Sequence, residues 1–416
     1  MSQTIPPIAP APARARLPLV FILATVAIDS IGIGLIFPVM PELIRDLTGR
    51  SFSDAALWGG VLATSFAVMQ FLFGPVVGNL SDRFGRKPVL LSAMAIMAVD
   101  YLAMAVAHTI WLLLLTRTLA GITAATHSTA TAYMADVSAP EDRETSFGYI
   151  GAAFGAGFVL GPLIGGLLAT VDVRVPFYAA AVLAGVNFVF GALVVPESLP
   201  RDKRRAFSWG RSNPLASFAA IGKLPGLAPL LLLLGLYHFA FFVYPAIWAF
   251  YGQANFGWGP DKVGYSLATF GICMAIAQAL LVAPAIKRFG AYRTALGGLA
   301  LDAVVFAAYG VITAPLWIFV FIPISALGSV VGPAIQGIMS RAAPDDQQGE
   351  LQGVVASVMA VATILSPLVM TWIFARFTHE GVAIPRPGAP FLLSSLMLIC
   401  AMGLLVLWQR KQRPDG

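Results

Sequence analysis

Residues 78–90 read Gly78-Asn79-Leu80-Ser81-Asp82-Arg83-Phe84-Gly85-Arg86-Lys87-Pro88-Val89-Leu90. This signature segment is a short charged island between two long apolar runs of the chain. One acid and three basic side chains lie so close together here that placing the segment in hydrocarbon would be too costly. The segment therefore predicts a hinge loop on the cytoplasmic surface of a membrane, between two spanning helices.

The composition on either side of the segment is that of an integral membrane protein. Of 416 residues, 58% are hydrophobic and 11% are charged, and the mean hydropathy of +0.82 is well above that of soluble domains. Apolar runs of about 20 residues, the length that a helix needs to cross the hydrocarbon core, leave no room for a soluble domain. We expect an all-α membrane fold with twelve transmembrane helices, at residues 17–40, 56–80, 88–107, 110–135, 147–169, 175–195, 227–250, 263–285, 293–312, 315–339, 352–375 and 389–408.

The basic residues are distributed unevenly between the loops. If both termini are cytoplasmic, the loops on that side hold nineteen of the 26 Lys and Arg residues, the other loops hold six, and Arg117 lies within a span. This positive-inside bias predicts a multi-pass protein of a bacterial-type inner membrane, with both termini and the central loop in the cytoplasm. Because the charges follow topology, the net charge of +6 does not indicate a nucleic-acid partner. The two cysteines lie in apolar runs, so neither a disulfide framework nor a cysteine metal site is expected.

The two halves of the chain resemble each other at one constant offset. Leu62-Ala63-Thr64 recurs as Leu267-Ala268-Thr269, and Arg83-Phe84-Gly85 as Arg288-Phe289-Gly290, each 205 residues later; Gly148 and Gly353, and Pro162-Leu163 and Pro367-Leu368, repeat likewise. Several sequence repeats at one offset indicate that the two halves arose by duplication. We expect six-helix halves at 1–195 and 227–416, joined by a basic linker at 196–226. In transporters built from such repeats, the substrate site lies at the repeat interface near the bilayer midplane.

Four ionisable residues lie well inside predicted spans: Asp29, Asp100, Arg117 and Asp302. Each costs roughly 2.5–3.5 kcal/mol to insert, so each is a functional candidate, with a charge pair that locks helix packing as the alternative. Arg117 either supplies site electrostatics or pairs with Asp29 or Asp100. Three acids and one base in a cavity favour protons and cationic substrates. A carboxylate that binds either a proton or a cation would exchange one for the other, which is antiport.

Polar and aromatic side chains in the spans supply candidates for a substrate pocket. Gln70 and Gln278 can each donate and accept hydrogen bonds, which suits a polar ligand in a dry cavity, although amides also join helices to one another. In the span 227–250, Tyr237, Phe241, Tyr244 and Trp248 share one helix face by their spacing. This stripe could stack on an aromatic drug, and packing or lipid contact is the other interpretation.

The span 147–169 is unusually rich in glycine, which allows a helix to approach another backbone closely. Its residues Gly157, Gly161, Pro162, Gly165 and Gly166 resemble the antiporter motif of drug-exporting transporters. The motif favours export over import. Gly-Pro near mid-span also weakens the local hydrogen-bond ladder.

The signature segment resembles the loop between helices 2 and 3 of the major facilitator superfamily, through Gly78, Asp82, Arg83, Gly85, Arg86 and Lys87. Asp82 can act on a helix N-terminus or an arginine, while the three basic residues can reach carboxylates or lipid phosphate. The resemblance implies a gating latch that stabilises the outward-open state. A basic loop that only determines topology is the alternative.

Further stretches resemble the tetracycline/proton antiporter family, among them 29–41, 100–102, 117–123, Asn213-Pro214-Leu215-Ala216-Ser217-Phe218 and 347–353. The resemblance implies exchange of a divalent metal–tetracycline complex for protons. It assigns Asp29, Asp100 and Asp302 as the intramembrane acids, Arg117 as the arginine of helix 4, and Gln70 and Gln278 as pocket residues. Where the family has a histidine four residues before the glutamine of helix 8, this chain has Met274. A thioether cannot relay a proton as imidazole does, and it suits an adaptable apolar pocket.

We therefore expect a proton-coupled exporter of a small drug-like compound that works by alternating access as a monomer. A broader multidrug/proton antiporter and a proton-coupled metabolite importer are the alternatives. No nucleophile motif or phosphate-binding Gly-Lys loop supports an enzyme or an ATP-driven pump. The expected partners are the small-molecule substrate, protons and membrane lipid. We expect no cofactor, with a divalent metal entering only as part of the substrate.

Overall fold

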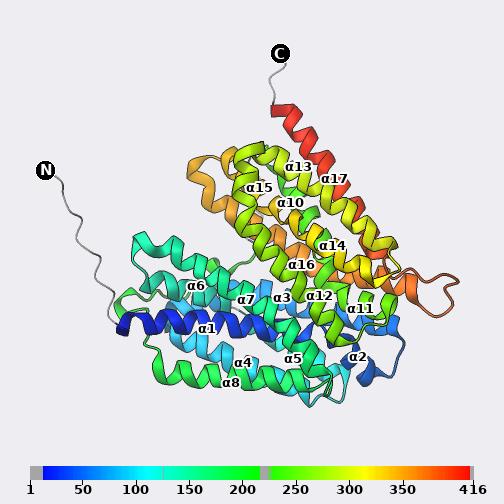
Figure 1. Ribbon diagram of the computed structural model, residues 1–416. Helices are drawn as coiled ribbons and strands as arrows, with labels where there is room; N and C mark the ends of the chain where they lie inside the picture. The colour runs from blue at the N-terminus through cyan, green and yellow to red at the C-terminus, as the bar shows by residue number, and fades with distance from the viewer. Residues whose placement is uncertain (1–12, 125, 216–223, 225, 413–416) are drawn as a thin grey trace.

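The computed structural model describes residues 13–124, 126–215, 224 and 226–412. Within these residues the protein is helical and contains no strand. Twelve helical stretches in the described part of the chain are long and apolar enough to cross a membrane, and they coincide with the twelve predicted spans. The all-α, twelve-span fold class is therefore confirmed. Figure 1 shows the helices gathered into two groups.

The first half, up to the central segment 196–226, contains α1 (Ala13–Ile36), α2 (Met40–Thr48), α3 (Phe52–Phe84), α4 (Arg86–Ala105), α5 (Ile110–Thr123), α6 (Thr126–Val137), α7 (Arg143–Ala169) and α8 (Val175–Val194). The second half contains α10 (Ala228–Phe241), α11 (Val243–Phe256), α12 (Pro260–Leu280), α13 (Val282–Val311), α14 (Pro315–Leu327), α15 (Val331–Ala342), α16 (Gln348–Thr378) and α17 (Ala389–Gln412). Short 3₁₀ turns include η3 (Trp209–Ser212) in the central segment and η5 (Gly328–Val330) between α14 and α15.

Three of the spans are broken into two helices, α5 with α6, α10 with α11, and α14 with α15, and α13 is interrupted at Gly290, where the backbone leaves the helical conformation. The second break ends α10 at Phe241, four residues before Pro245, and the third falls at η5, just before Pro333. A proline ring clashes with the carbonyl four residues earlier and removes one helical hydrogen bond, so a break at these positions has a local cause.

Consecutive spans run in opposite directions, so their connections alternate between two faces of the molecule. The terminal face carries the α3–α4 turn, the central segment and the C-terminal end of α17. The opposite face carries the connections at 37–51, 257–259 and 379–388.

The two halves meet near the opposite face. Thr64 Oγ1 donates to the carbonyl of Ile364 (2.9 Å), and the hydroxyls of Ser53 and Thr378 lie 3.1 Å apart. These residues lie in the parts of α3 and α16 nearest the opposite face. From this contact the halves diverge toward the ends that carry α6 and α15 (Figure 1).

A similar contact joins the halves twice, and its two prolines are at the offset seen in the sequence. The carbonyl of Pro162 on α7 lies against Gly264 of α12, and the carbonyl of Pro367 on α16 lies against Gly60 of α3. Pro162 and Pro367 are 205 residues apart. A proline carbonyl of each half therefore faces a glycine of the other half.

Helix α7 lies between α1 and α12, and its glycines face both neighbours. A Cβ atom on Gly161 would lie 2.7 Å from the Cα atom of Gly34 and 2.7 Å from the carbonyl oxygen of Ile31. Gly157 and Gly165 face α1 in the same way, while Gly166 faces the backbone at Pro260 and Asp261 of α12. The predicted motif is thus a packing surface with two sides.

We predict that Gly161→Ala lowers the free energy of unfolding by about 1–3 kcal/mol, because its methyl group would overlap the backbone of α1. Gly148→Ala is the matched control, since no atom lies within 4 Å of the Cβ position at Gly148 on the same helix. Thermal unfolding of the detergent-solubilised variants measures the difference. Equal melting temperatures for the two variants would contradict the prediction.

Candidate functional site

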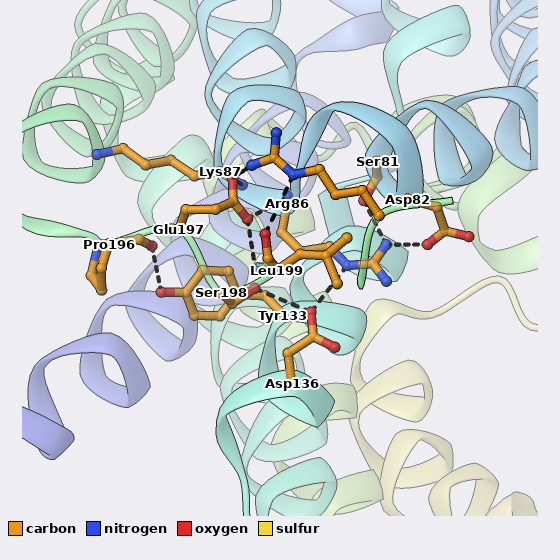
Figure 2. Close-up of polar contacts among 11 residues, drawn as sticks. Ser81, Asp82, Arg86, Lys87, Tyr133, Asp136, Pro196, Glu197, Ser198 and Leu199 are labelled. Carbon is orange, nitrogen blue, oxygen red and sulfur yellow. Dashed lines mark hydrogen bonds and ion pairs between the residues drawn. The ribbon is translucent and has the colours of Figure 1, made fainter. Parts of the chain in front are cut away.

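The signature segment turns sharply at Gly85, which has a φ of +108° and separates α3 from α4. Arg86 then joins three helices: Nη1 contacts Asp82 Oδ1 (2.8 Å) and donates to Ser81 Oγ (2.7 Å), while Nε donates to Asp136 Oδ2 of α6 (3.2 Å). Figure 2 shows these contacts converging on the guanidinium. Of the two predicted roles for Asp82, the structure contains the contact with an arginine.

Glu197 caps the first turn of α4, with its carboxylate beside Arg86 and Lys87 (Figure 2). Its carboxylate accepts hydrogen bonds from the backbone N–H groups of Arg86 (2.8 Å), Lys87 (3.3 Å) and Leu199 (3.0 Å). The first N–H groups of a helix lack intrahelical partners and carry positive partial charge, so a carboxylate is well placed there. Sequence reasoning missed Glu197, although an acid at the start of a basic linker was a visible signal.

The central segment is fastened to the first half at several further points. Tyr133 Oη donates to the carbonyl of Pro196 (2.8 Å), and the Arg205 N–H donates to the carbonyl of Asp82 (3.1 Å). Asn79 Nδ2 donates to the Ser208 carbonyl (2.6 Å) and to the hydroxyl of Ser212 (3.0 Å), which lies in η3. The signature segment and α6 together therefore hold residues 196–212 against the first half.

The other two basic residues of the signature segment form no ion pair with a carboxylate within the described residues, and their contact with lipid phosphate stays a prediction. The guanidinium of Arg83 is exposed and lies 5.2 Å from the centroid of the Phe84 ring, and Lys87 Nζ donates to the carbonyl of Ala192 (3.0 Å). Among the described residues, only Arg86 of the three predicted cations pairs with carboxylates through its side chain. At Gly78 no atom would contact an added Cβ, so this glycine meets no close neighbour.

Two of the four intramembrane ionisable residues form a pair. Arg117 of α5 binds Asp100 of α4, and their side chains are only 14% and 3% exposed. The guanidinium also lies 5.4 Å from the centroid of the Phe66 ring on α3. Of the two acids considered for Arg117, the partner is therefore Asp100. Asp100 Oδ1 and Arg117 Nε are buried with no partner in the described residues.

Asp29 lies on α1, beside this pair. It is half-buried, and Gly32, one turn further along α1, packs against the Tyr101 side chain that follows Asp100. No ion pair of Asp29 occurs within the described residues. Asp29, Asp100 and Arg117 therefore lie on adjoining helices of the first half.

Asp302 lies apart from these three groups, in the second half. It is 2% exposed on α13, and its carboxylate packs against Gly328 in η5. Its Oδ2 atom is buried and has no hydrogen-bond partner in the part of the chain that the structure describes. The structure thus corrects the expectation that all three acids and Arg117 share one cavity.

The predicted aromatic stripe belongs mainly to the interior of the second half. Tyr237 is 6% exposed, and Phe241 packs on Tyr244 with ring centroids 5.5 Å apart. Tyr244 also stacks on Phe270 at 5.0 Å. Tyr237 is therefore a core residue rather than a pocket wall, because the stripe faces α12 and α13 instead of open space.

The remaining predicted pocket residues lie in different environments. Met274 is half-buried against the main hydrophobic core, whereas Gln278, one turn later on α12, is exposed. Gln70 is exposed on α3 and donates from Nε2 to the carbonyl of Ala124 (3.1 Å).

A cavity of about 600 Å³ lies between α3, α16 and the central segment. Its volume is in the range of drug-binding pockets. The cavity joins residues of both halves to the linker; the polar and turn-forming residues on its wall are Gln70, Pro75, Asn213, Pro214, Ser357 and Thr363. Asn213 and Pro214 belong to the linker string noted in the sequence, of which residues 216–218 lie outside the described residues.

At the opposite face, two carboxylates from different halves interact across the contact. Glu42 of α2 is half-buried, and Asp261 lies in the first turn of α12, with its backbone against Gly166. Burial is the main cause that raises the pKa of Glu42 above its usual value; Arg45 lowers it in part and Asp261 raises it further. Since a raised pKa means tighter proton binding in this conformation, the closed face is stabilised at low pH and loses that stabilisation as pH rises through the raised pKa.

We predict that the Gly85→Ala variant unfolds more readily than Gly290→Ala. Both glycines have positive φ, +108° and +78°, so each alanine suffers backbone strain of about 1–3 kcal/mol. Only at Gly85 would the methyl group also collide with the Glu197 carboxylate, because no atom lies near the Cβ position at Gly290. Thermal unfolding ranks the two variants, and a Gly290→Ala variant that melts at the lower temperature would refute this account.

We also predict that the opposite face opens more often as pH rises through the pKa of Glu42. In a background without Cys273 and Cys400, a Ser53→Cys probe between the halves should react with a thiol reagent faster at higher pH, after correction for thiolate formation. Glu42→Gln should remove this dependence, and Glu380→Gln, an exposed acid on the same face, should not. A profile that Glu42→Gln leaves unchanged would exclude this role.

Comparison with known proteins places this architecture in a family. The family model of the Major Facilitator Superfamily matches residues 22–259 and 230–416. The chain is 41% identical to the tetracycline resistance protein, class C, of Escherichia coli over 367 residues, which are 88% of this chain and 92% of that protein. It is 35% identical to the class G protein of Vibrio anguillarum over 353 residues, 85% of this chain and 89% of that protein.

Among solved structures, the fold is similar to that of the nucleoside transporter NupG. The TM-score is 0.76 at 13% sequence identity, and the match covers 96% of this chain and 100% of the other. This likeness concerns the fold alone. The chain therefore belongs to the major facilitator superfamily, among the relatives of the tetracycline resistance proteins, and is a multi-pass membrane transporter rather than an enzyme.

Proposed function

We propose that the protein exports a tetracycline–divalent metal complex in exchange for protons. The observation that carries the proposal is the 41% identity, over most of both chains, to a tetracycline resistance protein. Among the described residues, no group of three or more His, Cys, Asp and Glu side chains could hold a metal ion. In the proposal the metal is therefore held by the drug and is part of the substrate.

The cavity between α3, α16 and the central segment suits the entry of such a compound. Its wall offers the amide of Gln70 and the hydroxyls of Ser357 and Thr363, and none of the described residues on the wall is charged. A metal-chelated drug with little net charge can form hydrogen bonds there without leaving a buried protein charge unpaired. We propose that the drug enters from this side and that Asp29 lies further along its path.

We propose that the terminal face is cytoplasmic, in the inner membrane of a bacterium, because the basic residues gather there. The structure would then be the inward-open state, since the halves meet near the opposite face. Rocking about the glycine–proline contacts would open the opposite face and release the drug. In that movement the signature segment acts as a latch, and the chain works as a monomer.

Asp302 is the proposed proton carrier. A charged carboxylate with a buried, unpartnered oxygen is costly, whereas a proton removes that charge. The driving force available is about 1.4 kcal/mol per pH unit, plus about 2.3 kcal/mol per net charge moved across 100 mV.

We predict that tetracycline with Mg²⁺ releases protons from the detergent-solubilised protein in weakly buffered solution. Asp302→Asn should abolish this release, because an amide cannot exchange a proton with solvent as a carboxyl group does. Asp46→Asn is the control, since Asp46 is 59% exposed in a surface pair with Arg174. A pH-sensitive dye measures the release, and no release by the wild-type protein would contradict proton coupling.

A broader multidrug/proton antiporter is the second candidate, and Met274 is the observation that favours it. A flexible thioether that is half-buried against the main hydrophobic core accommodates varied apolar shapes. In the same assay, release by lipophilic cations and none by tetracycline would select this function. Proton-driven accumulation of a sugar instead of drug release would select the importer.

A further inference from the structure

The interior of the second half contains polar atoms that its apolar packing does not require. Asp302 Oδ2, the hydroxyl of Tyr309 and the hydroxyl of Ser329 are all buried, and none has a hydrogen-bond partner in the described residues. Buried polar groups without partners are unfavourable, and in folded proteins they are commonly satisfied by internal water. Internal water would satisfy these three atoms.

One of these atoms, the Tyr309 hydroxyl, lies beside a close pair of hydroxyls. Tyr244 Oη and Ser325 Oγ are 2.6 Å apart, and either can be the donor. The Tyr309 ring meets the Tyr244 ring edge to face, with centroids 6.2 Å apart. The Tyr309 hydroxyl lies beside this pair without satisfying the geometry of a hydrogen bond to either member. Three hydroxyls thus meet in the aromatic core.

The carboxylate of Asp302 lies at one end of this cluster. It packs against Gly328, three residues after Ser325 and directly before Ser329. Asp302 and Tyr309 share the buried face of α13, seven residues or about 10 Å apart along the helix. Of the two residues, Tyr309 lies nearer the opposite face, because α13 ends at that face, at Val311.

A hydroxyl can accept one proton while it donates its own, whereas a backbone carbonyl only accepts. Tyr244, Ser325 and Tyr309 can therefore pass a proton on. Tyr251 cannot do so in this arrangement, because its hydroxyl donates to the backbone carbonyl of Tyr309 (2.7 Å).

We infer that Tyr309, Tyr244 and Ser325, together with internal water, form a proton relay between the opposite face and Asp302. In loading, Asp302 Oδ2 takes a proton from its neighbouring hydroxyl or water, and each donor is reprotonated by the next group toward the opposite face. The only net change is the transfer of one proton to the carboxylate. The inference rests on the proposed proton coupling and adds the route that the proton takes.

The test uses the full-length protein in proteoliposomes and two readouts. One readout is tetracycline–Mg²⁺ transport driven by a pH gradient; the other is exchange of labelled for unlabelled tetracycline at equal pH, which needs no net proton movement. Tyr244→Phe, Tyr309→Phe and Ser325→Ala should each slow driven transport about tenfold or more. The same variants should leave exchange unchanged. Tyr251→Phe, which also removes a buried hydroxyl, is the matched control and should keep both activities.

The outcomes separate the two proposals. If pH-driven transport occurs in the wild type and persists in all three variants, the relay is overturned but the proposed proton coupling stands. An equal loss of driven transport and exchange in the variants also overturns it, because that pattern reflects damaged structure. If the wild type exchanges drug but shows no pH-driven transport, proton coupling itself fails, and the relay fails with it.

Discussion

The fold depends on close backbone contact between helices in a solvent that supplies no hydrophobic attraction between them. Lipid chains are as apolar as leucine, so helices associate through van der Waals packing that only small residues permit at short range. Gly60 and Gly264 meet this requirement where each faces a proline carbonyl of the other half. The same proline leaves its helix without one internal hydrogen bond, so each of these close contacts between the halves lies beside a weak point of α7 or of α16.

Much of the fold could be predicted because hydropathy and charge act on every span in the same way. Prediction of the twelve spans required no knowledge of packing. The 205-residue offset indicated paired features such as Gly85 and Gly290. The breaks near Pro245 and Pro333 could not be predicted with equal ease. Proline is tolerated within spanning helices wherever neighbours satisfy the freed carbonyl, and this depends on tertiary contacts.

The sequence indicated which types of residue form the site, but not how those residues are arranged. Hydropathy shows that Asp100 and Asp302 are within the membrane, but it does not show which side of each helix they occupy, and the structure separates them. Tyr237 and Phe241 have the spacing of a stripe, and a stripe fits a core as well as a pocket. Glu197 was missed because a linker was expected to be a spacer, whereas its carboxylate completes the first turn of α4.

The contact between the halves and the cavity use different residues of the same helix. On α3, Gly60 and Thr64 face α16, while Gln70 lies two turns further on at the cavity wall. A drug that selects for new side chains at the cavity therefore acts on positions that do not hold the halves together. In evolutionary terms, the choice of cargo and the machinery of movement are separable traits, and new specificities can arise in this scaffold without a new way of moving.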